Sequence, residues 1–304
     1  MSFGYSECSL CARNCGVNRE GGELGFCSMS ADAEIARAAL HFWEEPPISG
    51  ECGSGTVFFV GCSLGCVFCQ NRDISRQSSS TERGKRVTDR ELADIMLTLQ
   101  SKGAHNINFV TPTHFAPTVV ESVKIARSRG LAVPIVYNTG SYDSLESITA
   151  LADTVDVYLV DYKFHREATA EKMARAEDYP TVARKVIEAA VKQKGSAVFE
   201  NGLMRSGVIV RLLLLPGHVA EAKLAVKYLY ETYGDKIYIS LMNQYTPMPN
   251  MSPPLDRKVT DAEYSELVDY AIKKGVKNAF IQEGGTAEES FIPPFDLTGA
   301  ESEV

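Results

Sequence analysis

The sequence has no long hydrophobic run. Its most apolar stretch, residues 208–215, is interrupted by Arg211 and is far shorter than the roughly 20 residues that cross a bilayer. The first ten residues, MSFGYSECSL, lack the basic start and the apolar stretch of a secretory signal. We therefore expect a cytoplasmic protein with no membrane partner.

Positive charge is also scarce. The 304 residues include 31 Lys and Arg against 39 Asp and Glu, which gives a formal net charge of −8. This balance argues against general binding to nucleic-acid phosphates. Apolar residues make up 44% and charged residues 23%, a mixture that is typical of a globular enzyme.

Cysteine is absent after residue 69. Seven of the eight cysteines fall into two groups, which are Cys8, Cys11, Cys15 and Cys27, and then Cys62, Cys66 and Cys69. In a reducing compartment, clustered cysteines are more often metal ligands than disulfides. The first quarter of the chain therefore carries the metal chemistry, and the rest supplies scaffold and substrate site.

From residue 56, short apolar runs alternate with amphipathic helical segments. We expect strands at 56–60, 107–110, 134–137, 155–160, 208–215, 237–242 and 279–282. We expect helices at 89–101, 118–129, 144–153, 181–194, 220–232 and 261–274, and a further helix at 31–39. Strands that are apolar on both faces indicate a parallel sheet covered by helices. Six or seven such alternations predict an α/β fold with a barrel, open or closed, of βα units.

Helix boundaries and domains follow from local signals. Thr88 and Thr260 are expected N-caps, and Gly103, Gly130 and Gly275 stand at helix ends. Residues 1–50 form a cysteine-bearing N-terminal extension with too few apolar residues for a core, so a metal or the main domain must order it. Residues 51–285 form the barrel, and residues 286–304 form an acidic C-terminal tail.

The second cysteine group has the spacing C-x3-C-x2-C directly after the first predicted strand of the barrel. Three thiolates at this spacing, Cys62, Cys66 and Cys69, can each reach a separate iron of a four-iron cubane. The fourth iron stays open to a ligand, whereas a structural zinc site fills all four positions. The alternatives are buried core thiols or three ligands of a zinc site.

This motif, with Phe68 before its last cysteine, resembles the radical S-adenosylmethionine (SAM) superfamily. The segments GCSLGCVFCQN, VTPTH, YNTGSYDS, DVYLVDYKF, VIVRLLLLPGH and ISLMNQYTP resemble the homologues of pyruvate formate-lyase activating enzyme. The resemblance implies a partial (β/α)6 barrel and a [4Fe–4S] cluster held by Cys62, Cys66 and Cys69. It implies that SAM binds the open iron through its amino and carboxylate groups and is reductively cleaved to a 5′-deoxyadenosyl radical that abstracts hydrogen.

Two substrate classes stay open. An activase takes hydrogen from a glycyl-radical protein, and it needs an electron donor such as flavodoxin or ferredoxin. The alternative is a radical SAM enzyme that modifies or cleaves a small metabolite, a nucleoside or a peptide. The sequence does not discriminate between them.

Polar groups at the carboxyl ends of the predicted strands are the candidate site, because functional groups of βα barrels lie there. Asp161 and Lys163 resemble the D-x-K pattern of the activating enzymes, and Arg211 resembles their R-x4-P-G pattern, so all three are expected to bind SAM. The alternatives are a surface ion pair and a salt bridge between strands. Because a buried charge is costly alone, we expect Arg211 to point into the barrel toward a carboxylate.

Further strand-end residues complete the set. Asn138 can donate and accept hydrogen bonds with ribose hydroxyls. Thr111 and Thr113 stand where the activating enzymes carry a glycine-rich acidic turn, and hydroxyls and carbonyls can accept an ammonium group. The predicted substrate contacts are His114, Gln244 and Tyr245. The alternative for the histidine is a plain loop residue, and that for the tyrosine is a packed core residue.

The first cysteine group, Cys8, Cys11, Cys15 and Cys27, supplies four thiolates. Four ligands can close a structural zinc site, and cubanes are also commonly held by four cysteines. Unliganded thiols are the third alternative. The spacing indicates that the four act together and leaves the metal open.

Overall fold

The computed structural model describes residues 3–75, 84–282 and 293–300. The strands are β1 (Ala33–His41), β2 (Ser54–Phe59), β3 (Lys85–Val87), β4 (Ile107–Val110), β5 (Ile135–Thr139), β6 (Val157–Asp161), β7 (Val198–Glu200), β8 (Leu203–Leu213), β9 (Tyr238–Met242) and β10 (Ala279–Ile281). The helices are α1 (Pro46–Ser49), α2 (Arg72–Ser75), α3 (Asp89–Ser101), α4 (Ala116–Ser128), α5 (Leu145–Ala150), α6 (Glu167–Ala174), α7 (Tyr179–Lys194), α8 (Val219–Tyr233) and α9 (Asp261–Lys274). Two short 3-10 turns, η1 (Thr113–Phe115) and η2 (Gly234–Lys236), complete the described elements.

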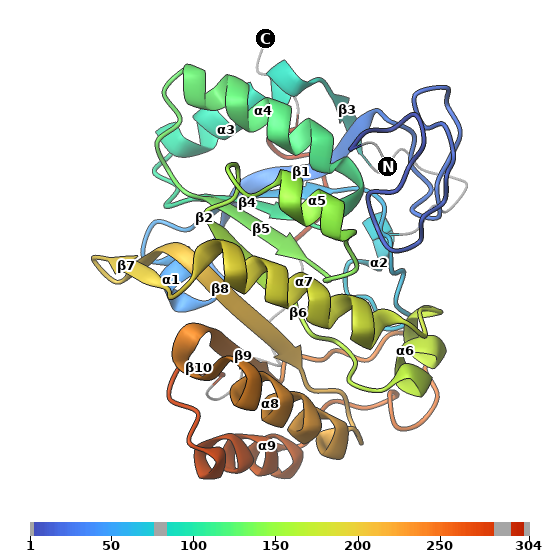
Figure 1. The fold of residues 1–304 in the computed structure, drawn as a ribbon, viewed down its shortest axis with the longest axis vertical. Helices are drawn as coiled ribbons and strands as arrows, with labels where there is room; N and C mark the ends of the chain where they lie inside the picture. Colours follow the sequence, from blue (N-terminus) through green and yellow to red (C-terminus); the bar gives the residue numbers. More distant parts are fainter. Residues whose placement is uncertain (1–2, 76–83, 283–292, 301–304) are drawn as a thin grey trace.

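The strands form one sheet in the order β10-β9-β8-β6-β5-β4-β2-β1-β3, and β7 pairs with β8 off this path. The neighbours from β2 to β10 are parallel, whereas β1 is antiparallel to both β2 and β3. Figure 1 shows α3, α4, α5, α7, α8 and α9 along one side of this sheet. The sheet and its helices form the α/β partial barrel that the alternating pattern predicted.

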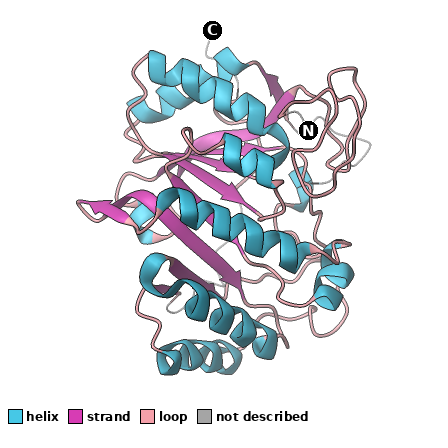
Figure 2. Cartoon of the chain, in the orientation of Figure 1, coloured by secondary structure: helices cyan, strands magenta, loops and turns pink. Residues whose placement is uncertain are grey.

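The predicted strands are all confirmed, and their burial explains why the pattern identified them. Every residue of β2, β4 and β5 is buried, as expected for strands covered on both faces. Thr88 and Thr260 each cap a helix in a capping box, with Glu91 and Glu263 as the reciprocal partners. The helices that these caps start cover the outside of the sheet (Figure 2).

The helix predicted at 31–39 is wrong, because this segment is β1. Alanine, glutamate and arginine favour helix locally, but propensity is weak against tertiary pairing. Here β2 and β3 supply backbone partners on both sides of the strand. Ile35 and Ala36 are fully buried, so burial of apolar side chains stabilises the strand in addition to that pairing.

The segment that follows β1 enters the inside of the barrel. Its sequence, HFWEEPPISG, reads as a loop, yet it contains the short helix α1, whose Pro46 stands at the first helical position. Ile48 is fully buried in a core cluster that includes Val136 of β5 and Ile209 of β8. The Asn106 side-chain amide donates to the Ile48 carbonyl at 2.7 Å, which fixes α1 to the sheet.

The N-terminal segment packs on the barrel through a buried arginine. Arg19 is 1% exposed and donates to the backbone carbonyls of Met29, Ser30 and His114 at 3.1, 2.7 and 2.6 Å. This segment, dark blue in Figure 1, is mostly loop until β1 begins. Because the His114 carbonyl belongs to the barrel, one cation orders the extension and attaches it to the main domain.

The described part of the C-terminal tail, residues 293–300, runs beside β1. The Ala38 N–H donates to the Thr298 carbonyl, and the Leu297 N–H donates to the Ala36 carbonyl. β1, which lies within residues 1–50, thus joins the barrel sheet to this tail. The division into extension, barrel and tail stays a prediction. Within the described ranges, no helix is both long and apolar enough to cross a bilayer.

Candidate active site

A cavity of about 870 Å³ opens on the inner side of the sheet. Residues of β2, β4, β5, β6, β8, β9 and β10 line it, together with the segment that precedes α1. It brings together most of the residues predicted from the strand ends, which are Cys62, Cys66, Cys69, Thr111, Thr113, Asn138, Asp161, Lys163, Arg211 and Gln244. Side chains that lie up to 182 positions apart in the chain therefore share one space.

The cysteine loop supplies three free thiols to this cavity. Burial raises the pKa of Cys66 to about 12, the neighbouring thiols of Cys62 and Cys69 add to the rise, and the Lys163 ammonium opposes it. The irons of an iron–sulfur cluster bind such groups in their deprotonated, thiolate form, so a bound cluster would offset the cost of burying them. In the part of the chain that the structure describes, no three Cys, His, Asp or Glu side chains meet closely enough to bind a single ion. Three free thiols on one loop that line one cavity are a donor set of the kind that a cubane takes.

The cysteine loop is held by the N-terminal segment. Gly61, directly before Cys62, has φ +87°, and a Cβ there would lie 2.4 Å from Met29 Cγ, so only glycine fits. Arg13 Nε donates to the Ser63 carbonyl at 2.9 Å, and its Nη2 donates to the Ala174 carbonyl at 2.8 Å. Arg13 thus connects the extension, the cysteine loop and the end of α6, a role that the sequence did not indicate.

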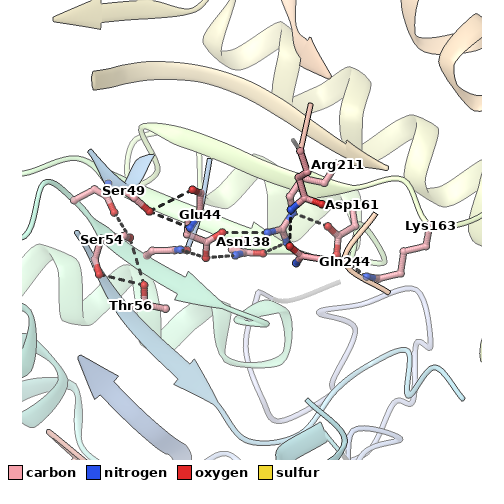
Figure 3. A network of polar contacts seen from close by, with 12 residues as sticks. Glu44, Ser49, Ser54, Thr56, Asn138, Asp161, Lys163, Arg211 and Gln244 are labelled. Atoms are coloured by element: carbon pink, nitrogen blue, oxygen red, sulfur yellow. Dashed lines mark hydrogen bonds and ion pairs between the residues drawn. The ribbon is translucent and has the colours of Figure 1, made fainter. Parts of the chain in front are cut away.

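A network of buried charges centres on Arg211 (Figure 3). Its Nε donates to Asp161 Oδ1 at 2.8 Å, its Nη2 to Asn138 Oδ1 at 2.5 Å, and its Nη1 lies 3.2 Å from Glu44 Oε2. Lys163 Nζ donates to Asp161 Oδ2 at 2.6 Å. Arg211 therefore points into the barrel toward carboxylates, as expected, and its pair with Asp161 of the neighbouring strand is also the salt bridge between strands that was the alternative.

The network keeps Asp161 and Lys163 ionised. Burial acts to raise the pKa of Asp161, but Arg211 and Lys163 outweigh it, so the pKa lies below its usual range. Burial acts to lower the pKa of Lys163, but Asp161 outweighs it, so that pKa is raised. An ammonium has three N–H donors, and Lys163 uses one of them in its hydrogen bond to Asp161. The cavity therefore presents a fixed cation beside the cysteine loop.

Thr111 and Thr113 turn the chain at the end of β4. Thr111 has φ +57°, a conformation that is rare and costly for a β-branched residue and that clusters at functional sites. Its backbone N–H donates to the Asn138 carbonyl at 2.9 Å. Thr113 Oγ1 lies 3.1 Å from Thr139 Oγ1, which in turn donates to Asp143. Both threonines line the cavity where the ammonium-accepting turn was predicted.

Sequence reasoning missed two acidic residues, Glu44 and Glu45, which it left in a loop. Glu44 Oε1 accepts hydrogen bonds from Asn108 Nδ2 at 2.8 Å and from Asn138 Nδ2 at 3.3 Å. Glu45 is 8% exposed and also lines the cavity. The one available signal was the expectation that Arg211 needs a buried carboxylate, which did not say where in the chain that carboxylate lies.

The structure places one of the three predicted substrate contacts in the cavity and the other two outside it. Gln244 lines the cavity and accepts at Oε1 from Gln282 Nε2 at 2.6 Å. His114 and Tyr245 are not among the described residues that line it. The ring of His114 is buried and donates from Nε2 to the Val60 carbonyl at 2.7 Å, and Tyr245 donates to the Leu255 carbonyl. Both side chains lie in the packed interior.

The four N-terminal cysteines lie close to one another. A Cβ placed on Gly25 would lie 3.4 Å from Cys27 Sγ and 3.7 Å from Cys15 Sγ. Burial raises the pKa of Cys11, and the thiols of Cys27, Cys15 and Cys8 add to the rise. The four thiols are therefore neighbours, although no three of them meet closely enough in the described structure to bind one ion, and their role as metal ligands stays a prediction.

The fold and the cysteine-lined cavity define the class of protein. The sequence pattern of the Radical SAM superfamily matches residues 56–222, and the chain belongs to this superfamily of enzymes. Membership implies a [4Fe–4S] cluster and SAM as cofactors. Among particular proteins, the chain is similar to MJ0674 of Methanocaldococcus jannaschii, described as uncharacterized, with 27% identity over 276 residues, 88% of this chain and 75% of that protein.

Solved structures share the fold at low identity. Streptococcus suis SuiB has a TM-score of 0.50 and 11% identity, covering 76% of this chain and 48% of its own. HydG, the FeFe-hydrogenase maturase of Carboxydothermus hydrogenoformans, has a TM-score of 0.50 and 14% identity, covering 70% of this chain and 49% of its own. The chain therefore spans about half the length of these two proteins, and the likeness concerns the fold alone.

The buried His114 generates a prediction on stability. Burial, aided by the Arg19 charge, lowers the pKa of His114 to about 3, from 6.5 for an unperturbed histidine. The unfolded chain therefore takes up a proton below pH 6.5 that the folded protein does not. We expect stability to fall between pH 7.5 and pH 5.5, with His114 contributing about 1 kcal/mol of the loss. His114→Gln should remove that contribution.

Chemical unfolding at the two pH values measures this effect, with His105→Gln as the matched control on a partly exposed ring. The control should keep the decline of the unmodified protein. An unchanged pH dependence in His114→Gln would contradict the neutral, buried state of this imidazole.

Proposed function

We propose that Cys62, Cys66 and Cys69 hold the [4Fe–4S] cluster, and that the protein binds SAM beside it to abstract hydrogen from a substrate in the same cavity. The observation that carries this proposal is the opening of the cysteine loop into the cavity of the Asp161 and Arg211 network. When bound, the cluster supplies an electron and SAM supplies the 5′-deoxyadenosyl radical, which is the chemistry that the protein itself lacks.

The residues of this chain supply binding and orientation. The Lys163 ammonium can hold a carboxylate, while Asp161 keeps it charged and in place. The Asn138 amide belongs to the same network and can form hydrogen bonds with hydroxyl groups. Thr111 and Thr113 can accept an ammonium through hydroxyl and carbonyl oxygens.

The first candidate for the substrate is a glycyl-radical protein. Asp161-Tyr162-Lys163 and Arg211, followed by Pro216-Gly217, resemble the patterns of the activating enzymes, and these two segments meet in one network. In this role the protein takes hydrogen from a glycine Cα, and flavodoxin or ferredoxin supplies the electron.

The second candidate is a small molecule or a peptide. A cavity of about 870 Å³ falls in the range of small-molecule sites, and it carries the buried carboxylates Glu44 and Glu45 at one end. Charged groups that are fixed in a cavity favour a ligand of complementary charge.

The cluster assignment is tested by cysteine replacement. Replacing Cys62, Cys66 and Cys69 by Ala should abolish formation of 5′-deoxyadenosine after anaerobic reconstitution, because no thiolate remains to hold the cluster that the cavity is built for. The exposed Cys52 provides the matched control, and Cys52→Ala should retain full cleavage. Product from the triple variant would refute the assignment.

The first cysteine group is tested by metal analysis. Four thiolates that hold zinc should give about one zinc and four irons per chain, whereas a second cubane should give about eight irons. Replacing Cys8 and Cys11 by Ser should then loosen residues 3–30, measured by hydrogen exchange, because the metal supplies folding free energy. Four irons without zinc would rule out both assignments.

The substrate candidates are separated by isotope transfer. The reconstituted protein is incubated with deuterium-labelled candidates, and label is followed into 5′-deoxyadenosine by mass spectrometry. Transfer from a glycine-containing segment of a partner protein supports the activase. Transfer from small metabolites alone would discard it.

A further inference from the structure

Glu44 and Glu45 lie at the end of the polar network that is remote from the cysteines. Figure 3 shows the order: Lys163 stands at one side, Asp161 and Arg211 follow, and Glu44 lies at the other side. The charges of Lys163 and Asp161 both act on Cys66. A ligand that contacts the two glutamates is therefore held at a different place from one that contacts the cysteine loop.

Carboxyl groups outnumber cationic groups in the cavity. Of the described Asp, Glu, Lys and Arg side chains that line it, three are acidic and two are basic. Both cations bond Asp161, and Arg211 also bonds Glu44. Among these described carboxylates, Glu45 is the one without an ion pair, although the Arg211 charge acts on it from nearby.

Glu45 also has an oxygen without a partner. Its carboxylate is buried, and within the described residues Oε2 accepts no hydrogen bond. An unpaired buried oxygen of this kind is costly, and a donor on a ligand would remove that cost. Burial raises the pKa of Glu45 and Glu44 adds to the rise, whereas Arg211 and hydrogen bonds from the Ser240 side chain and the Glu45 backbone act against it. A bound cation would lower this pKa and supply the missing donor together.

The position of Glu45 is rigid. It precedes Pro46, which starts α1, and Ile48 anchors that helix in the core. The Glu44 N–H donates to Ser49 Oγ at 3.0 Å, which closes the turn over the helix. These contacts fix the backbone that carries the Glu45 carboxylate. The carboxylate is therefore pre-organised inside the cavity rather than free to move into solvent.

Aromatic side chains line the same cavity. Phe42, Trp43 and Phe280 all line the cavity. Aromatic faces attract ammonium and guanidinium groups, by about 0.5–2 kcal/mol according to their desolvation. Carboxylate and aromatic rings together form the environment that favours an organic cation over an anion or a neutral polyol.

We propose that Glu45 recognises a positively charged nitrogen group of the substrate, an ammonium or a guanidinium. This inference rests on the proposed function only in taking the cavity as the substrate site. The cation can belong to a small amine or to a basic side chain of a peptide, and the chemistry of recognition is the same for both.

Calorimetric titration of the anaerobically reconstituted, SAM-loaded protein tests the proposal. The probes are agmatine, putrescine, the peptide Gly-Lys-Gly and the uncharged 1,4-butanediol. We expect at least one cation to bind and the diol not to bind. Glu45→Gln should weaken that binding by about tenfold to a hundredfold, the effect of losing a charge-assisted hydrogen bond. Glu188→Gln, on the exposed side of α7, is the matched control and should bind as the unmodified protein does.

Binding by the small amines or by the peptide identifies the source of the cation, and either supports the proposal. Equal binding by Glu45→Gln, equal binding of the diol, or binding by none of the cations would overturn it. A loss of SAM affinity in Glu45→Gln would also overturn it, since the residue would then serve the cofactor. The comparison of cations with the diol needs no variant. These measurements involve no turnover, so their failure differs from a failure of SAM cleavage.

Discussion

The buried guanidinium of Arg211 determines how the inside of this barrel is arranged. A charge taken out of water is costly unless partners surround it, and breaking a buried pair costs about 3–5 kcal/mol. The partners come from separate parts of the chain: Asp161 from β6, Asn138 from β5 and Glu44 from the segment before α1. One side chain therefore ties the sheet to the segment that enters it.

That segment depends on apolar packing as well as on charge. Ile48 is buried among residues of β5, β6 and β8, and the Asn106 amide bonds its carbonyl. Core burial of this kind contributes about 1.5–3 kcal/mol for one large aliphatic side chain. The anchor offsets part of the cost of placing two adjacent carboxylates inside the barrel. The same packing that completes the core thus presents Glu44 and Glu45 to the cavity.

The sequence could predict the features that depend on hydrophobic periodicity and on the spacing of residues close together in the chain. The strands could be predicted because they are buried on both faces and are therefore apolar along their length. The cysteine spacing identified the loop that lines the cavity. The strand Ala33–His41 was misread because its alanines favour helix until β2 and β3 pair with it. Glu45 was missed because its surroundings come from distant strands. His114 and Tyr245 were misplaced because a position at a strand end does not fix the direction of a side chain.

The N-terminal segment is part of the support of the cysteine loop. A Cβ on Gly61 would lie 2.4 Å from Met29 Cγ and 2.9 Å from the Cys27 carbonyl oxygen, so the two segments pack too closely for any side chain there. Arg13, between Cys11 and Cys15, donates to the Ser63 carbonyl within the loop. Because packed interiors transmit displacement rather than absorb it, the order of the first cysteine group is a condition for the geometry of the second. The extension is therefore built into the site at the level of individual contacts.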